Sequence, residues 1–197
     1  MSRNRLLLLL ACILGVAIAG GLAWKAGVFD KAPPPSSIGG PFQLVDQTGK
    51  RVDESVLKGK WSAVFFGFTY CPDVCPGTLQ ALTATSDLMG SKGKDLQIVF
   101  ISVDPERDTP ANVKQWLEAQ RPPAGTLGLT GTKAESDAAA KAYRVLHSKA
   151  GDGPDYLVNH STAIYLMDPK GRFVRILAYG MTPEQMADQI KSAMRGD

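Results

Sequence analysis

Hydrophobic positions along the chain fall into one long uninterrupted run near the N-terminus and several short runs further on. The long run covers residues 6–24 and contains no charged residue. An apolar segment of about 20 residues is long enough to cross a bilayer once as a helix. Arg3 and Arg5 precede it, so the positive-inside rule places residues 1–5 in the cytoplasm. The pattern predicts a single transmembrane anchor that leaves the rest of the chain outside the cytoplasm.

Two features of this leader leave its processing open. Ala17-Ile18-Ala19 has the small residues of a signal-peptidase site, and cleavage there would release the remainder of the chain. Leu9-Leu10-Ala11-Cys12 loosely resembles a lipoprotein box, although the apolar stretch before it is very short. We favour an uncleaved anchor because the apolar run continues past both points. The leader lacks the Arg- and Ser-rich character of a transit peptide, which indicates a bacterial inner membrane with the domain facing the periplasm.

Residues 25–40 read as a linker. They contain Pro33-Pro34-Pro35, followed by serine and glycine. Consecutive prolines keep a chain stiff and extended, so we expect this segment to hold a domain of residues 41–197 away from the membrane surface.

Short apolar runs alternate with helical patterns over the rest of the chain. Near-continuous apolar runs at 62–68 and 97–103 predict buried strands of a covered sheet. Further strands are predicted within 42–52 (a hairpin), at 127–130, at 156–158, and as a second hairpin of 162–167 with 173–177. Helices are predicted from Pro76 to about Leu88, after Thr109-Pro110, over 134–146 and after Thr182-Pro183. This order predicts an α/β domain with the thioredoxin-like fold, a central mixed sheet flanked by helices.

Composition narrows the functional classes. The chain has 197 residues, and without the leader roughly 160 remain, which suits one domain with a full core. The net charge is +3, with basic residues scattered among acidic ones, so we expect no nucleic-acid partner. Of the three cysteines, Cys12 lies in the leader, which leaves Cys71 and Cys75. Two cysteines are too few for a disulfide framework and suit a local metal or redox site.

Cys71 and Cys75 lie where the strand at 62–68 passes into the helix that Pro76 is predicted to open. Sites in open α/β sheets form at the carboxyl ends of strands, and a helix N-terminus favours the reactive thiolate. One coiled turn would place the two α-carbons roughly 6 Å apart, which suits two ligands of one ion and also permits a disulfide. The alternative is a structural disulfide or a pair of buried thiols. We favour a functional site because a proline follows each cysteine.

Two thiolates alone under-coordinate copper or zinc, so a third ligand is expected. The sequence offers two histidines, His147 and His160. His160 lies at the entrance of a predicted strand and is the better candidate, whereas His147 follows an alanine-rich helix and is expected to face solvent near its C-terminus. Two sulfurs and one nitrogen favour copper, while structural zinc prefers four ligands. We therefore predict one copper ion per chain, held by Cys71, Cys75 and His160.

Three segments in this order resemble the Sco/SenC family. They are Gly67-Phe68-Thr69-Tyr70-Cys71-Pro72-Asp73-Val74-Cys75-Pro76, Ile101-Ser102-Val103-Asp104-Pro105-Glu106-Arg107-Asp108-Thr109-Pro110, and His160-Ser161 with the hairpin that follows. The resemblance covers about residues 38–196 and the anchor. It implies a membrane-anchored, thioredoxin-like copper protein that helps to assemble the CuA centre of cytochrome c oxidase. Matching by motif makes Cys71, Cys75 and His160 the copper ligands.

The resemblance also implies partners and one departure. The implied partners are the oxidase subunit that carries the CuA site and other copper chaperones. The family pattern has an acid before the histidine, where this chain has Asn159, which weakens a charge interaction but leaves the ligands intact.

Four further residues near the motifs are not expected to be ligands. Asp73, between the cysteines, is placed to tune charge at the metal, and Asp104 and Arg107 to shape the rim or a partner surface. Asp108 with Thr109 reads as a turn and helix cap.

Two functional classes remain open. In the first, the domain is a copper metallochaperone and not an enzyme. In the second, it is a thiol–disulfide oxidoreductase that uses Cys71 and Cys75 to reduce target cysteines before metal insertion. A peroxidase is the weaker alternative because no further catalytic set surrounds Cys71 in the sequence.

Overall fold

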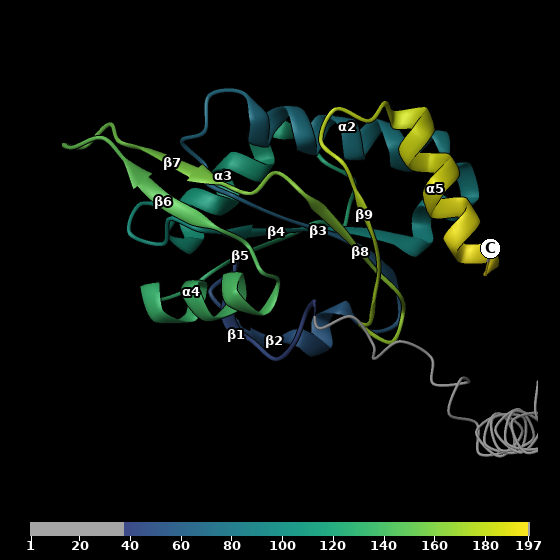
Figure 1. Cartoon of the computed structure of the whole chain (residues 1–197), viewed down its shortest axis with the longest axis horizontal. Coiled ribbons are helices and arrows are strands. Elements are labelled where there is room, and N and C mark those ends of the chain that lie inside the picture. The colour runs from purple at the N-terminus through teal and green to yellow at the C-terminus, as the bar shows by residue number, and fades with distance from the viewer. Residues whose placement is uncertain (1–37, 197) are drawn as a thin grey trace, which may run out of the picture. The chain divides into compact units, whose positions relative to one another are not determined.

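A seven-stranded mixed sheet forms the centre of the domain. Figure 1 shows this sheet between the helices. The computed structural model describes residues 38–196. The strands of the sheet are β1 (Gln43–Asp46), β2 (Arg51–Asp53), β3 (Trp61–Gly67), β4 (Leu96–Ser102), β5 (Leu127–Thr130), β8 (Ile164–Met167) and β9 (Phe173–Leu177). Their spatial order is β2-β1-β5-β4-β3-β8-β9, with β3, β4 and β5 parallel and the outer pairs antiparallel. This is the thioredoxin-like α/β arrangement that the sequence predicts.

Helices cover both faces of this sheet. They are α2 (Val74–Leu88), α3 (Pro110–Gln120), α4 (Lys133–Ala142) and α5 (Pro183–Arg195), with short 3-10 turns at Glu54–Leu57 and Gly90–Asp95. Figure 1 shows α2 and α5 together on one side of the sheet and α4 on the other. Because neighbouring side chains of a strand point to opposite faces, Phe65 belongs to one hydrophobic cluster and Phe66 to the other.

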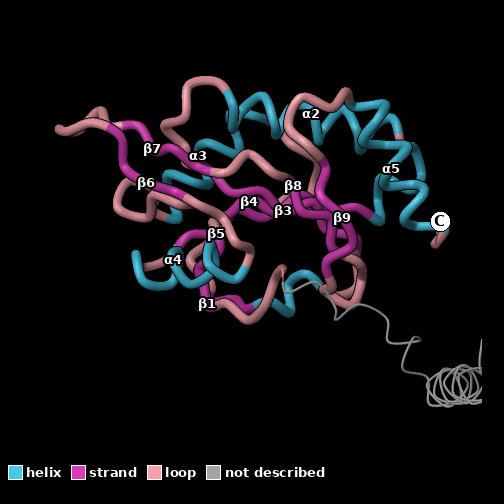
Figure 2. Tube along the Cα trace, in the orientation of Figure 1, coloured by secondary structure: helices cyan, strands magenta, loops and turns pink. Residues whose placement is uncertain are grey.

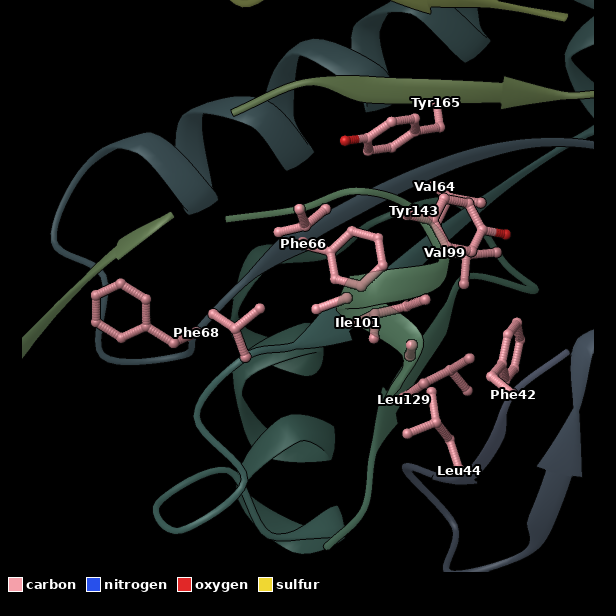
Figure 3. Packing of buried hydrophobic residues seen from close by; sticks show 14 of the residues in the cluster. Phe42, Leu44, Val64, Phe66, Phe68, Val99, Ile101, Leu129, Tyr143 and Tyr165 are labelled. Atoms are coloured by element: carbon pink, nitrogen blue, oxygen red, sulfur yellow. The ribbon is translucent and has the colours of Figure 1, made fainter. Parts of the chain in front are cut away.

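The cluster that contains Phe66 runs the length of the sheet. Figure 3 shows Phe42 and Leu44 at one end of it and Phe68 at the other. Phe68 is 2% exposed and begins the loop after β3. The hydrophobic core therefore extends to the base of the loop that carries the cysteines.

Threonine side chains cap three of the helices, and two of these helices, α3 and α5, begin where the sequence predicted. Thr109 accepts a hydrogen bond from the amide of Asn112, with Pro110 at the first position of α3. Thr182 forms a capping box at the start of α5 with Gln185, and Thr132 does the same for α4. These side chains satisfy amide groups that have no partner within the helix.

Two helix boundaries differ from the prediction. Helix α2 begins at Val74, so Pro76 lies inside the first turn and does not open the helix. A proline is tolerated there because amides of the first turn need no partner within the helix. Helix α4 ends at Ala142 instead of residue 146. Tyr143 is fully buried and Arg144 adopts a φ of 57°, which breaks the helical path.

A second, two-stranded sheet follows α4. It consists of β6 (His147–Ala150) and β7 (Leu157–His160), which pair antiparallel with each other and with no strand of the main sheet. We call these residues 147–160 the hairpin sheet, and Figure 2 shows it at the edge of the molecule. The sequence predicted a strand at 156–158 but missed β6, because its residues are half-buried or exposed and carry no apolar alternation.

The predicted anchor at 6–24 and most of the linker at 25–40 lie outside the described residues. Within residues 38–196, no helix has both the length and the apolar character needed to cross a membrane.

Candidate functional site

The cysteine loop, residues 68–75, joins β3 to α2. The amide of Cys71 donates to the carbonyl oxygen of Phe68 at 3.2 Å, which closes a tight turn. The amide of Cys75 in turn points at Sγ of Cys71, at 3.4 Å. Cys75 is buried and Cys71 is half-buried, and both carry free thiols. The loop therefore coils by about one turn and brings the two sulfurs into one cluster, as the spacing of the cysteines predicted.

His160 completes a cluster with the two cysteines. Its Nε2 atom lies 3.6 Å from Sγ of Cys75, although the residues are 85 positions apart. Its Nδ1 atom lies 3.0 Å from the carbonyl oxygen of Ser161, which can only accept, so the proton is on Nδ1. This leaves a lone pair on Nε2, the ring atom that lies close to Sγ of Cys75. His160 is the last residue of β7, not the entrance of the following strand as the sequence suggested.

Burial sets the protonation of this cluster. It raises the pKa of the Cys75 thiol well above its usual value, and the nearby Cys71 and Asp108 raise it further. For Cys75, this effect of burial on the pKa opposes the preference for thiolate that is expected at the helix N-terminus. Burial also lowers the pKa of His160, so its imidazole is neutral near pH 7. A metal ion would meet a neutral imidazole but would have to displace the thiol proton.

The donor set fits a soft, low-coordinate metal. The cluster contains one ligand atom from each of Cys71, Cys75 and His160, and these three atoms all lie within 4.8 Å of one another. Within residues 38–196 this is the one group of three or more His, Cys, Asp or Glu side chains with that geometry. Two sulfurs and one imidazole nitrogen match the preferences of copper, whereas a structural zinc site has four protein ligands.

His147 lies outside this cluster. It faces His160 across the hairpin sheet, but its Nε2 atom lies 3.4 Å from the carboxylate of Asp137. From the sequence, the side chain of His147 is expected to face solvent near a helix C-terminus. In the structure this side chain is only 20% exposed. That expectation is wrong because α4 ends early and the chain turns into β6. His147 is not among the three residues of the ligand cluster.

Asp104 lies outside the ligand cluster and forms an ion pair with Arg107. Nε of Arg107 donates to the buried carboxylate of Asp104 at 2.6 Å, and the hydroxyl of Tyr156 donates to the same carboxylate at 2.5 Å. Burial, followed by this hydrogen bond, raises the pKa of Tyr156 to about 12, so the phenol keeps its proton. Asp73 is exposed and precedes α2 without a side-chain capping bond.

Asp108 has a structural role that the sequence did not reveal. Thr109 alone caps α3, and the carboxylate of Asp108 instead accepts from the amide of Thr69 at 3.1 Å and from its hydroxyl at 2.5 Å. The hydroxyl of Ser102 donates to the same carboxylate at 2.5 Å. Asp108 is fully buried, and this burial raises its pKa in spite of the three donors. It fixes the start of the cysteine loop to the end of β4.

Known proteins are similar to this chain over most of its length. Protein SenC of Rhodobacter capsulatus is 44% identical over 156 residues, which cover 79% of this chain and 70% of that protein. Protein SCO1 homolog 1, mitochondrial, of Arabidopsis thaliana is 41% identical over 162 residues, or 81% of this chain. The match covers 48% of the Arabidopsis protein, so the chain spans about half the length of that relative.

Comparison of the fold with solved structures identifies the same group of proteins. The crystal structure of Arabidopsis thaliana ScoI with copper bound superimposes with a TM-score of 0.76 at 41% identity. The superposition covers 81% of this chain and 99% of that one. The sequence profile of the SCO1/SenC family matches residues 30–195, which include both cysteines and His160. The chain therefore belongs to the SCO1/SenC family.

Proposed function

We propose that this protein is a copper metallochaperone that assists assembly of the CuA centre of cytochrome c oxidase. It binds one copper ion per chain through the sulfurs of Cys71 and Cys75 and the Nε2 atom of His160. The observation that carries the proposal is the convergence of these three donor atoms within 4.8 Å. The copper-bound structure of the similar Arabidopsis protein supports the choice of metal.

The site is suited to passing its copper on. Three protein ligands leave a coordination position open, so a thiolate of the target can bind before a ligand of this chain leaves. Cys71 is half-buried and Cys75 is buried, which makes Cys71 the accessible edge of the site. The acceptor is the oxidase subunit that carries the CuA site, and other copper chaperones supply the ion.

The leader sets the location. Residues 6–24 anchor the chain in the bacterial inner membrane by one helix, with residues 1–5 in the cytoplasm. Residues 25–40 then hold the domain of residues 41–197 in the periplasm. The uncharged run and the two arginines before it support this orientation.

A thiol–disulfide oxidoreductase is the second candidate. The free thiols of Cys71 and Cys75 are close enough to form a disulfide after a small movement of the sulfurs. The pair could then reduce the target cysteines before copper enters them. In this role Cys71 and Cys75 would be the catalytic redox pair, and His160 would be dispensable.

Metal analysis with electronic spectroscopy of the purified, reduced full-length chain separates the two functions. We expect one copper per chain and an intense thiolate-to-copper(II) charge-transfer band. The band is lost in His160→Ala and kept in His147→Ala, the matched control across the hairpin sheet. Copper binding by His160→Ala as tight as in the wild type would disprove the three-ligand site. Failure of the wild type to bind copper, with thiol exchange that depends on Cys71, would favour the reductase.

A further inference from the structure

Arg107 lies at the centre of a group of aromatic and charged side chains beside the cysteine loop. Its guanidinium carbon lies 3.6 Å from the ring centroid of Tyr156 and 4.7 Å from that of Tyr70. Besides its ion pair with Asp104, it donates a hydrogen bond to the carbonyl oxygen of Pro154 at 3.1 Å. The side chain is 14% exposed. One residue thus contacts the loop after β4, the cysteine loop and the hairpin sheet with its connecting turn.

Side-chain contacts position the hairpin sheet, which packs Tyr156 and Val158 into the hydrophobic cluster that contains Phe66. Its two strands pair with no strand of the main sheet, so no backbone ladder fixes where it sits. Tyr156 immediately precedes β7, and its hydroxyl is bound to Asp104. The ammonium group of Lys149 lies 3.9 Å from the centroid of the same ring. The residue before β7 is therefore held by Arg107 and Asp104, and the four-residue strand β7 ends at His160.

A second route leads from Arg107 to the histidine ring. The guanidinium carbon lies 5.8 Å from the ring centroid of Phe68, which is buried at the end of the hydrophobic cluster in Figure 3. The ring of Phe68 meets the imidazole of His160 edge to face, with centroids 5.9 Å apart and planes at 87°. The imidazole therefore rests against an aromatic ring that Arg107 itself contacts.

We propose that Arg107 is a positioning residue that clamps the hairpin sheet to the cysteine loop and thereby holds His160 at binding distance from Cys75. This inference rests on the proposed copper site. It assigns a role to Arg107, which contacts no metal itself and acts on copper binding through the position of His160. An arginine suits this role because its planar guanidinium stacks on rings while its edge donates several hydrogen bonds. A lysine keeps the charge beside Asp104 but loses the stacking and the forked donors.

The test is a double-mutant cycle for copper(I) affinity on the reduced full-length chain, measured by competition with bicinchoninate. Arg107→Lys is the main variant because it leaves Asp104 with a positive neighbour. We expect it to weaken copper(I) binding about tenfold in the wild-type background and to have no further effect in His160→Ala. The matched control is Arg172→Lys, which alters an arginine–aspartate pair at the β8–β9 turn. It should leave the affinity unchanged.

The cycle distinguishes positioning from a general effect on the fold. Equal weakening by Arg107→Lys in the presence and absence of His160 would overturn the inference, since the effect would then pass through the cysteines or the whole domain. Unchanged affinity in Arg107→Lys would overturn it as well. A matching readout is the nitrogen hyperfine coupling of the copper(II) form, which we expect to weaken in Arg107→Lys and to persist in Arg172→Lys. A wild-type chain that binds no copper would instead refute the proposed function.

Discussion

Gly67 leaves the space that the sulfur of Cys75 occupies. A β-carbon at position 67 would lie 2.5 Å from Sγ of Cys75 and 3.2 Å from the ring of Phe100. Gly67 is the last residue of β3, and its backbone φ is not positive, so the requirement for glycine is one of space and not of conformation. The end of the central strand is shaped around the buried thiol.

Gly67→Ala should therefore damage the site and the core together. The added methyl group has to displace Cys75 or Phe100, and overpacking of this kind costs about 1–3 kcal/mol of unfolding free energy. We expect a lower thermal midpoint and weaker copper(I) binding. Gly77→Ala is the matched control on the first turns of α2, where a β-carbon meets nothing within 4 Å. It should preserve copper binding and slightly stabilise the helix, and equal behaviour of the two variants would contradict the packing argument.

Copper binding should release protons. Because burial raises the pKa of Cys75, its thiol is protonated near pH 7, whereas the lowered pKa of His160 leaves that imidazole neutral. Copper(I) added to the reduced chain in weak buffer should thus release at least one proton per ion, and the apparent affinity should rise about tenfold per pH unit for each proton displaced. His160→Ala should release as many protons for each ion that it binds. Binding without proton release would show that Cys75 is already a thiolate.

The three candidate ligands could be predicted from the sequence, whereas the contacts around them could not. Cys71 and Cys75 could be placed because a strand, a loop and a helix follow one another locally, and His160 followed from the need for a third ligand. The positions of His147 and Asp108 could not be predicted. The first depends on the end of α4 at Ala142, just before the buried Tyr143, and the second on a hydrogen bond to Thr69, 39 positions away. Local patterns carry no information about such contacts.

Asp108 should give the domain a pH dependence of unusual sign. Its pKa is raised by burial above the ordinary value of 3.8, so above that value the unfolded chain loses the proton first and the folded state is penalised. The unfolding free energy of the wild type, relative to Asp108→Asn, should fall as pH rises above about 3.8. Asp168 is the control, because the hydrogen bonds from Arg172 and Lys170 outweigh burial and lower its pKa. Relative to Asp168→Asn, the wild type should lose stability as pH falls through that lowered pKa.

Urea unfolding of the three proteins between about pH 3 and pH 8 measures both slopes. Each difference from the wild type reports the replaced carboxyl group and the few groups coupled to it, since the contributions of all distant titrating groups cancel. A wild-type advantage over Asp108→Asn that grows with pH would mean that the donors from Thr69 and Ser102 outweigh burial. The carboxylate would then be a stabilising anion under the cysteine loop.

Oxidation of the cysteine pair should abolish copper binding, because both processes use the same sulfurs. When Cys71 and Cys75 form a disulfide, each thiol gives up one proton and one electron to the oxidant, and neither sulfur remains as a thiolate ligand. We expect the chain treated with diamide to bind no copper and to regain one ion per chain after reduction with dithiothreitol. Cys12→Ser serves as the background, so that only the two cysteines of the domain are counted. In this background, bound copper(I) should also slow alkylation of Cys71 by iodoacetamide. Copper retained at full stoichiometry by the oxidised chain would show that the thiolates are not its ligands.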